Sequence, residues 1–537
     1  MTAEGHIPEK KPSVIKAAVA MSLGTILSRI LGYVRDAVLL ALFSRTVTDA
    51  FVVAFRLPNL VRRLLGEGSL SASFIPVYIE QMHADSSGER ARNLANATFT
   101  LLCSITMTLT VLAFVLMEPL LELWVGDKQG YAAIPGKMEL TANLSRIMVA
   151  YVFLVTTYAF LMGISNARQK FFIPALAPAL FNFVFICFAL LPQNLLAVPG
   201  SVLAWGVVAG GVVQVVLVAV QLYQIGHLPR LVFNFRVPGL RAVLSNLGPS
   251  LIGLGIYQVM TIANTFFAAT LPEGTQSYLF ASDRILELPQ SIIAISLGTA
   301  LLPAFSRQLA AGNKAAMLET ANEGLRAMLF LALPAAVGMF ILAQPIIEVL
   351  FMRGAFGADD ARTTAEIVQV YSGLLVVSSL AKVTVPGFYA IKNTRLPAVV
   401  AAIVLLAHLI LAKLLIGSYG VVGLATATAV SGALNMIMLQ VAFHFWLGPV
   451  GLKSIFVAVA RVVPALLLMA AVSHFGHEWL MGQASEPNAL VRALILLLTI
   501  AVAAVTYFMT ATLCGSAEAV RTLGALQRRI KAKVGHS

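Results

Sequence analysis

The sequence predicts an all-α polytopic membrane protein with about 14 transmembrane helices. Hydrophobic residues make up 59% of the 537 residues and charged residues only 11%, a balance foreign to soluble globular proteins of this length. Apolar runs long enough to cross a bilayer also recur along the whole chain. The predicted spans are 14–42, 47–82, 90–117, 138–166, 172–191, 201–225, 240–270, 276–308, 316–350, 364–391, 396–416, 420–447, 453–474 and 489–513. No signal peptide is predicted, because the first apolar run is too long and carries charges.

Internal repeats divide the chain. Phe74-Ile75-Pro76-Val77-Tyr78 resembles Leu301-Leu302-Pro303-Ala304-Phe305, and two further matches follow in the same order at nearly the same offset. They predict a six-helix half over 14–225 and a second over 240–447, related as parallel repeats. The two additional helices at 453–513 lie outside the repeat. Residues 1–13 are predicted to be a cytoplasmic tail, and 514–537 a basic cytoplasmic tail whose part from Arg521 is amphipathic.

The distribution of lysine and arginine predicts the orientation, since cytoplasmic loops are enriched in both. Five such residues fall on one side: Arg45, Lys128, Lys137, Arg353 and Arg362. Twenty fall on the other: Lys10, Lys11, Lys16, Arg90, Arg92, Arg168, Lys170, Arg230, Arg236, Arg241, Arg307, Lys314, Lys392, Arg395, Lys453, Arg521, Arg528, Arg529, Lys531 and Lys533. This count predicts that both termini are cytoplasmic, which requires an even number of spans.

Charged residues inside the first predicted span point to an anionic ligand. Arg29, Arg35 and Asp36 share an arc of about 140° with Gly24, Thr25, Ser28 and Gly32, whereas apolar residues cover the rest of the helix. A charge at mid-membrane costs about 2.5–3.5 kcal/mol, so several arginines there favour a functional role. Alternatively, Arg29 pairs with Asp36. The row Gly24, Ser28 and Gly32 also allows another helix to approach closely.

The second span continues this pattern. Arg56, Asn59 and Arg63 are spaced to share one helix face, and Pro58 and the glycines at 66–68 predict a break there. Broken helices at membrane depth are tolerated where they line a cavity. The alternative is that Arg62 and Arg63 extend to the headgroup layer.

The second half carries its own charge cluster in the span 276–308. Asp283 and Glu287 share a face, and Arg284 can reach Glu287 one turn away. One interpretation is a second wall of the same cavity, with a kink at Pro289. The other is an ion pair within one helix that has no further role.

Other chemistries find little support in the sequence. There is no phosphate-binding loop for ATP hydrolysis, and the net charge of +13 is explained by loops and intramembrane arginines without invoking nucleic acid. His408 is expected to be a packed core residue, and no spacing suggests a metal site. The three cysteines are expected to be small core residues: Cys103, Cys187 and Cys514. The acids expected to be ordinary loop charges are Asp85, Glu89, Asp359 and Asp360.

Several stretches together resemble a known family. They are SRILGYVRD, TDAFVVAFRLPNLVRRLLGEGSLSASFIP, YLFASDRILELPQSIIAISLGTALLP and VPGFYA. They resemble the MurJ/MviN family of bacterial lipid II flippases, within the multidrug/oligosaccharidyl-lipid/polysaccharide exporter superfamily. The resemblance covers almost the whole chain and implies export of the undecaprenyl-pyrophosphate-linked peptidoglycan precursor across the inner membrane. The substrate-binding positions it implies are Arg29, Arg35, Asp36, Asp49, Asn59, Arg62, Arg63, Arg284 and Glu287.

The resemblance also implies a mechanism. Two halves enclose a cationic cavity and expose it to each side in turn, while the helices at 453–513 form a groove for the lipid tail. Some relatives bind sodium through acids in spans seven and eleven, but this chain has no acid between Arg241 and Leu271 and carries His408 and Lys413 in span eleven. No cofactor is expected. The membrane potential is the expected driving force, and the coupling ion stays open.

The expected location is the bacterial inner membrane, and the expected partners are lipid II and membrane lipids. Cell-wall synthesis proteins are further candidate partners, and a monomer is expected. Two alternatives remain. An exporter of drugs or of another polyprenyl-linked oligosaccharide on the same core is disfavoured by the arginine density and the additional helices. A membrane-embedded glycosyltransferase or polymerase is disfavoured by the lack of a catalytic acid pattern.

Overall fold

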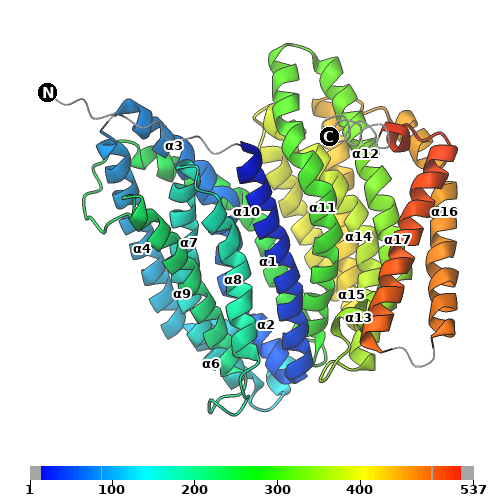
Figure 1. Ribbon diagram of the computed structural model, residues 1–537, viewed down its shortest axis with the longest axis horizontal. Helices are drawn as coiled ribbons and strands as arrows, with labels where there is room; N and C mark the ends of the chain where they lie inside the picture. Colours follow the sequence, from blue (N-terminus) through cyan, green and yellow to red (C-terminus); the bar gives the residue numbers. More distant parts are fainter. Residues whose placement is uncertain (1–13, 86, 128, 485–487, 522–537) are drawn as a thin grey trace, which may run out of the picture. The chain divides into compact units, whose positions relative to one another are not determined.

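The computed structural model describes residues 14–85, 87–127, 129–484 and 488–521, and these residues are helical with connecting loops and no strand (Figure 1). The terminal tails predicted for 1–13 and for most of 514–537 lie outside the described residues. The chain forms two compact units, 1–255 and 256–537. Nine helical stretches among the described residues are long and apolar enough to cross a membrane. The all-helical membrane fold is confirmed, whereas the count of fourteen spans stays a prediction.

Unit 1 contains the whole segment predicted for the first half, 14–225. The helices of this segment are α1 (Val14–Leu42), α2 (Arg45–Val61), the π-helix η1 (Arg62–Ser69), α3 (Leu70–Ala84), α4 (Glu89–Val115), α5 (Met117–Val125), the short 3-10 helix η2 (Tyr131–Ala133), α6 (Lys137–Met148), α7 (Ala150–Ala167), α8 (Phe172–Ala189) and α9 (Ser201–Gln224). Within this unit α8 packs between α1 and α9, α2 packs on α6, and α3 packs on α4 and α7. The helix α10 (Leu240–Ala268) spans the boundary between the units.

Unit 2 contains the helices that follow α10. They are α11 (Thr275–Ala310), α12 (Lys314–Ile341), α13 (Ala343–Phe351), α14 (Ala358–Ala390), α15 (Arg395–Trp446), α16 (Leu452–Gln483) and α17 (Ala489–Leu513). α14 packs against α11, α12 and α15, while α16 joins the unit through α12 and pairs with α17. The two predicted spans 396–416 and 420–447 form α15, which changes direction at Gly420, where the backbone adopts a positive φ of 54°. Glycine accepts this conformation without steric cost.

The small-residue row of α1 was predicted to allow close approach of another helix, and in the structure that helix is α8. A Cβ atom on the buried Gly24 would lie 2.7 Å from the backbone oxygen of Ala175, so only a glycine permits this approach. Eight residues further along the chain, Gly32 faces the amide of Asn182, which also donates to the backbone oxygen of Ser28 at 2.9 Å. Exposed Ile26, Ile30 and Val34 occupy another face of α1, as expected of a lipid-facing surface.

Two expectations about local structure need correction. The break predicted near Pro58 is absent because α2 stays helical through Pro58, but the predicted glycines 66–68 do lie where the helix changes, in the π-helix η1. π-Helices are rare and occur mostly near functional sites. Cys187 is exposed on α8 and is not a core residue, whereas Cys103 and Cys514 are half-buried. In an apolar span, an exposed small side chain costs little because it faces lipid.

Candidate functional site

Arg35 on α1 is held in place by residues of two helices. Its Nε and Nη2 atoms donate to Oδ1 of Asp36 at 2.9 and 2.7 Å, and its Nη1 donates to Oδ1 of Asn182 on α8 at 3.0 Å. Its guanidinium also lies 5.7 Å from the ring centre of Phe185. Asp36 is 1% exposed and Arg35 11%. Three of the five N–H donors of Arg35 therefore serve to fix its orientation.

Asn182 was not among the predicted site residues. An amide in the otherwise uncharged and apolar α8 is the only sequence signal that marks it. Because the spacing between Arg35 and Asn182 is 147 residues, helical periodicity could not join them.

The helices α1, α2 and η1 carry further arginines. The side chains of Arg29, Arg56, Arg62 and Arg63 are all half-buried. Arg62 donates from Nε to Oδ1 of Asn59 at 2.9 Å, so two predicted site residues are neighbours. Half-buried guanidinium groups combine a partly desolvated charge with access to a ligand, which favours binding of an anion such as a phosphate.

Asp49 of α2 forms an ion pair with a lysine of α6. Its Oδ2 accepts from Nζ of Lys137 at 2.8 Å, and both side chains are only 1% exposed. The Lys137 ammonium also lies 4.5 Å from the ring centre of Tyr131. The sequence predicted Asp49 as a substrate ligand and Lys137 as a loop residue, whereas the structure places them together in a buried ion pair between α2 and α6.

In unit 2 the predicted ion pair of α11 is present. Nη1 of Arg284 donates to Oε2 of Glu287 at 2.9 Å, and the guanidinium lies 5.1 Å from the ring centre of Phe280. The two side chains remain 26% and 40% exposed, and Asp283 is half-buried beside them. The pair thus orients Arg284 without burying it. The helix α11 continues through Pro289 to Ala310.

Two polar contacts elsewhere in unit 2 are structural. Asp360 is fully buried and accepts from Tyr278 at 2.6 Å and from the backbone N–H of Gly357 at 2.8 Å, so its prediction as an ordinary loop charge is wrong. His408 is fully buried, with its ring nitrogens 2.8 Å from Asn264 and 3.2 Å from Ser431. The prediction of a packed core histidine is therefore confirmed. Within the described residues, no group of three or more His, Cys, Asp or Glu side chains could hold a metal ion.

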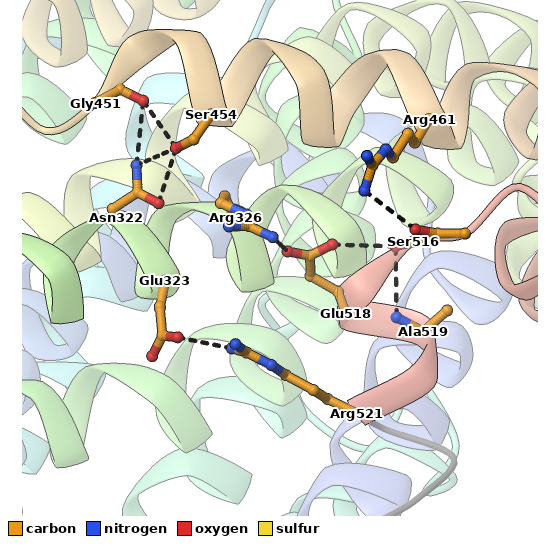
Figure 2. Close-up of polar contacts among 11 residues, drawn as sticks. Asn322, Glu323, Arg326, Gly451, Ser454, Arg461, Ser516, Glu518, Ala519 and Arg521 are labelled. Atoms are coloured by element: carbon orange, nitrogen blue, oxygen red, sulfur yellow. Dashed lines mark hydrogen bonds and ion pairs between the residues drawn. The ribbon is translucent and has the colours of Figure 1, made fainter.

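The two additional helices are fastened to α12 at one end of unit 2 (Figure 2). Asn322 of α12 donates to the hydroxyl of Ser454 on α16 at 2.7 Å. Beyond α17, Glu518 forms an ion pair with Arg326, and Arg521 donates to Glu323 at 2.8 Å. Deeper in the helices, the hydroxyl of the buried Tyr507 donates to the backbone oxygen of Phe330 at 2.8 Å. We call the contacts of 514–521 with α12 the C-terminal anchor.

Glu518 makes this anchor dependent on pH. Burial alone would raise the pKa of the Glu518 carboxyl, but hydrogen bonds from the backbone and Ser516 and the charge of Arg326 outweigh it and lower that pKa. The anchor should therefore stabilise the protein fully above the ordinary pKa of glutamate and lose this contribution as the pH falls through the lowered value. We expect Glu518→Gln to lower the thermal unfolding temperature at pH 7, and to do so less at pH 4. Thermal unfolding of purified protein at both pH values measures this.

The chain is similar to known proteins over most of its length. The family model described as lipid II flippase MurJ matches residues 39–485. A protein of Bdellovibrio bacteriovorus described as a probable lipid II flippase MurJ is 43% identical over 509 residues, covering 95% of this chain and 96% of that protein. The chain belongs to the lipid II flippase MurJ family.

Solved structures show the same fold. A structure described as lipid II flippase MurJ in an inward closed conformation aligns with a TM-score of 0.72 at 24% identity, covering 91% of this chain and 99% of that one. An inward-facing multidrug MATE transporter aligns with a TM-score of 0.67 at 15% identity over 80% of this chain. The family membership and the apolar helices make this chain a multi-pass membrane protein.

Proposed function

We propose that the chain flips lipid II, the undecaprenyl-pyrophosphate-linked peptidoglycan precursor, from the inner to the outer leaflet of the bacterial inner membrane. The observation that carries this proposal is the family membership at 43% identity over 95% of the chain. The chain is then a transporter and not an enzyme. Exporters of drugs or of other lipid-linked oligosaccharides are not favoured, because the family match and its MurJ relatives concern lipid II flippases.

The half-buried arginines suit the pyrophosphate of such a substrate. A guanidinium can donate two parallel hydrogen bonds to two phosphate oxygens, whereas an ammonium acts as a point charge. We assign direct phosphate contact to Arg29, Arg63 and Arg284. Arg35, whose donors are engaged by Asp36 and Asn182, contributes mainly charge and a fixed orientation. Asn59, Arg62 and Glu287 are assigned contacts with the sugar-peptide head.

The lipid tail and the energy source complete the proposal. α16 and α17 expose apolar side chains, among them Phe456 at 74%, Leu467 at 67% and Leu497 at 63%. We assign these two helices to contact the lipid tail. The membrane potential is assigned as the driving force, since moving one charge through 100 mV is worth about 2.3 kcal/mol. No cofactor is needed for such a mechanism.

The test of this function is the distribution of lipid II between the leaflets in a strain depleted of the protein. We expect lipid II to accumulate in the inner leaflet during depletion and to reach the outer leaflet again when the gene is expressed. A depleted strain that still exports lipid II at the normal rate, with no other flippase expressed, would assign this chain to another substrate.

Topology gives a separate prediction. From the lysine and arginine count we expect both termini and residues 83–92 and 227–237 on the cytoplasmic side, and 118–136 and 474–488 on the periplasmic side. In a variant lacking the three native cysteines, a cysteine at exposed Gln483 should react with an impermeant reagent added to intact cells. A cysteine at exposed Ser87 should react only after the membrane is opened. The reverse labelling pattern would invert the topology.

A further inference from the structure

The segment between α9 and α10 combines irregular backbone with exposed apolar side chains. Residues 228–236, Leu-Pro-Arg-Leu-Val-Phe-Asn-Phe-Arg, have no regular secondary structure. We call them the strap. Three apolar side chains of the strap are exposed: Leu231 at 63%, Phe233 at 80% and Phe235 at 43%. Exposed Arg230 and Arg236 enclose these apolar residues.

The strap is fastened to α4 by hydrogen bonds from its backbone. The N–H of Arg230 donates to Oδ1 of Asn96, and the N–H of Val232 donates to Oγ1 of Thr100, both at 2.8 Å. Asn96 is 7% exposed and Thr100 1%. Two buried polar side chains one turn apart on α4 therefore serve as acceptors for a segment that has no regular secondary structure.

The position of these acceptors shows how deep the strap lies along α4. The last charged residue of that helix is Arg92, and no Asp, Glu, Lys or Arg follows up to Val115. At 1.5 Å per residue, Asn96 and Thr100 lie about 6 and 12 Å beyond Arg92. Further along the same helix, Ile105, Leu109 and Leu112 are exposed, as on a lipid-facing surface. The strap thus runs from the charged end of α4 onto its uncharged part.

Side-chain acceptors for backbone N–H groups matter most where water is scarce. In the hydrocarbon region an unsatisfied N–H costs several kcal/mol, and irregular backbone is tolerated there only if other protein groups satisfy it. In water, Asn96 and Thr100 would be unnecessary for this purpose. The contacts and the exposed phenylalanines therefore favour the boundary between headgroups and acyl chains over an aqueous loop.

The charges around the strap select the kind of lipid. Arg230 and Arg236 belong to the strap, and Arg92 and Arg168 lie close enough to act on His227. Burial lowers the pKa of His227, and the positive charges of Arg168 and Arg92 lower that pKa further. Basic residues next to interfacial apolar residues attract anionic headgroups.

We propose that residues 228–236 are a membrane-embedded strap that binds an anionic phospholipid of the surrounding bilayer. Phe233 and its apolar neighbours insert beside the acyl chains of that lipid, and Arg230 and Arg236 contact its phosphate. The site is separate from the arginines assigned to lipid II and does not depend on transport.

Fluorescence quenching of a label at position 233 tests this. The substitution Phe233→Cys is made in a variant that lacks the three native cysteines, and the new cysteine is labelled with bimane. The labelled protein is reconstituted into two sets of phosphatidylcholine vesicles. One set contains acyl-brominated phosphatidylcholine, and the other contains acyl-brominated phosphatidylglycerol at the same mole fraction. We expect strong quenching by both lipids, and quenching by the phosphatidylglycerol stronger by about threefold or more. The matched control is Ala311→Cys, an exposed position in the loop between α11 and α12, where quenching should be weak.

Two further variants separate the parts of the proposal. Arg230→Gln with Arg236→Gln should make the two brominated lipids quench equally while leaving the label in the membrane. Thr100→Val keeps the shape of the side chain but removes the acceptor, and should reduce quenching by both lipids. Quenching at position 233 no stronger than at 311 would place the strap in water. Equal quenching by the two lipids in the variant that keeps both arginines would contradict the proposed preference for an anionic lipid. Unchanged quenching with Thr100→Val would contradict the proposal that α4 anchors the strap.

Discussion

Replacing Arg29 or Arg284 by alanine is expected to abolish lipid II transport while leaving the protein in the membrane. Removing a cation from a spanning helix lowers the cost of insertion, so the fold should tolerate it. Glu287, the partner of Arg284, is 40% exposed and is not left as a buried charge. A charge-assisted hydrogen bond is worth about 1.5–3 kcal/mol, so each lost bond should weaken binding of the pyrophosphate by about one to two orders of magnitude. Complementation of a depleted strain measures transport, and immunoblotting of membranes measures the amount of protein.

The lysine variants separate two modes of binding. If the site requires only positive potential, Arg29→Lys and Arg284→Lys should both support growth. If the pyrophosphate is held by the guanidinium fork, at least one should fail, and we expect Arg29→Lys to fail. Arg362 on α14 is the matched control: it is 78% exposed in a pair with Glu366, so Arg362→Ala should be active. Normal growth with both alanine variants at Arg29 and Arg284 would be incompatible with a cationic substrate site.

Among the substitutions considered, Lys137→Met is expected to cause the largest decrease in the free energy of unfolding. The substitution removes the ammonium partner of Asp49, a carboxylate with only 1% of its side chain exposed. Breaking a buried ion pair in this way costs about 3–5 kcal/mol, whereas replacing both partners by uncharged residues can be nearly neutral. The thermal unfolding temperature of the purified protein should therefore be markedly lower for Lys137→Met, and it should rise again when Asp49→Asn is added.

An exposed pair gives the control for this prediction. Arg146 and Glu118 are 34% and 68% exposed at 2.8 Å, so Arg146→Met should cost less than about 1 kcal/mol. The double variant of Lys137 and Asp49 also tests the assignment of Asp49 as a substrate ligand. A stable and active double variant leaves Asp49 a purely structural role, whereas a stable but inactive one supports contact with the substrate. Unfolding of Lys137→Met at the normal temperature would show that the pair does not hold α2 to α6.

Some helix boundaries were predicted from the sequence because they follow from apolar length and composition. The first span was predicted to end at residue 42 and the last to cover 489–513, as α1 and α17 do, whereas the predicted span 47–82 is divided among α2, η1 and α3. The ion pair of Arg284 with Glu287 was predictable for a similar reason, since partners one turn apart on a single helix are fixed by periodicity.

Contacts between helices could not be predicted in this way. Periodicity shows which residues share a face but not which helix that face meets. Asp49 and Lys137 are separated by 88 positions, and Tyr278 and Asp360 by 82. Asp360 was misassigned because two consecutive acids at the start of a span usually lie in water, whereas here one of them accepts from the backbone N–H of Gly357 and from Tyr278.

The π-helix η1 changes how the arginines relate to the rest of their span. Its hydrogen bonds close over five residues instead of four, so each residue turns the chain by less than in an α-helix. The directions in which the side chains of α3 point are therefore not those that an uninterrupted α-helix continuing from α2 would give. Phe74 and Tyr78, which are 0% and 1% exposed, face the core of unit 1 only with the phase that η1 supplies. Shortening residues 62–69 by one position would turn these aromatic side chains and the arginines relative to each other, so the length of this segment is constrained as strictly as its charges.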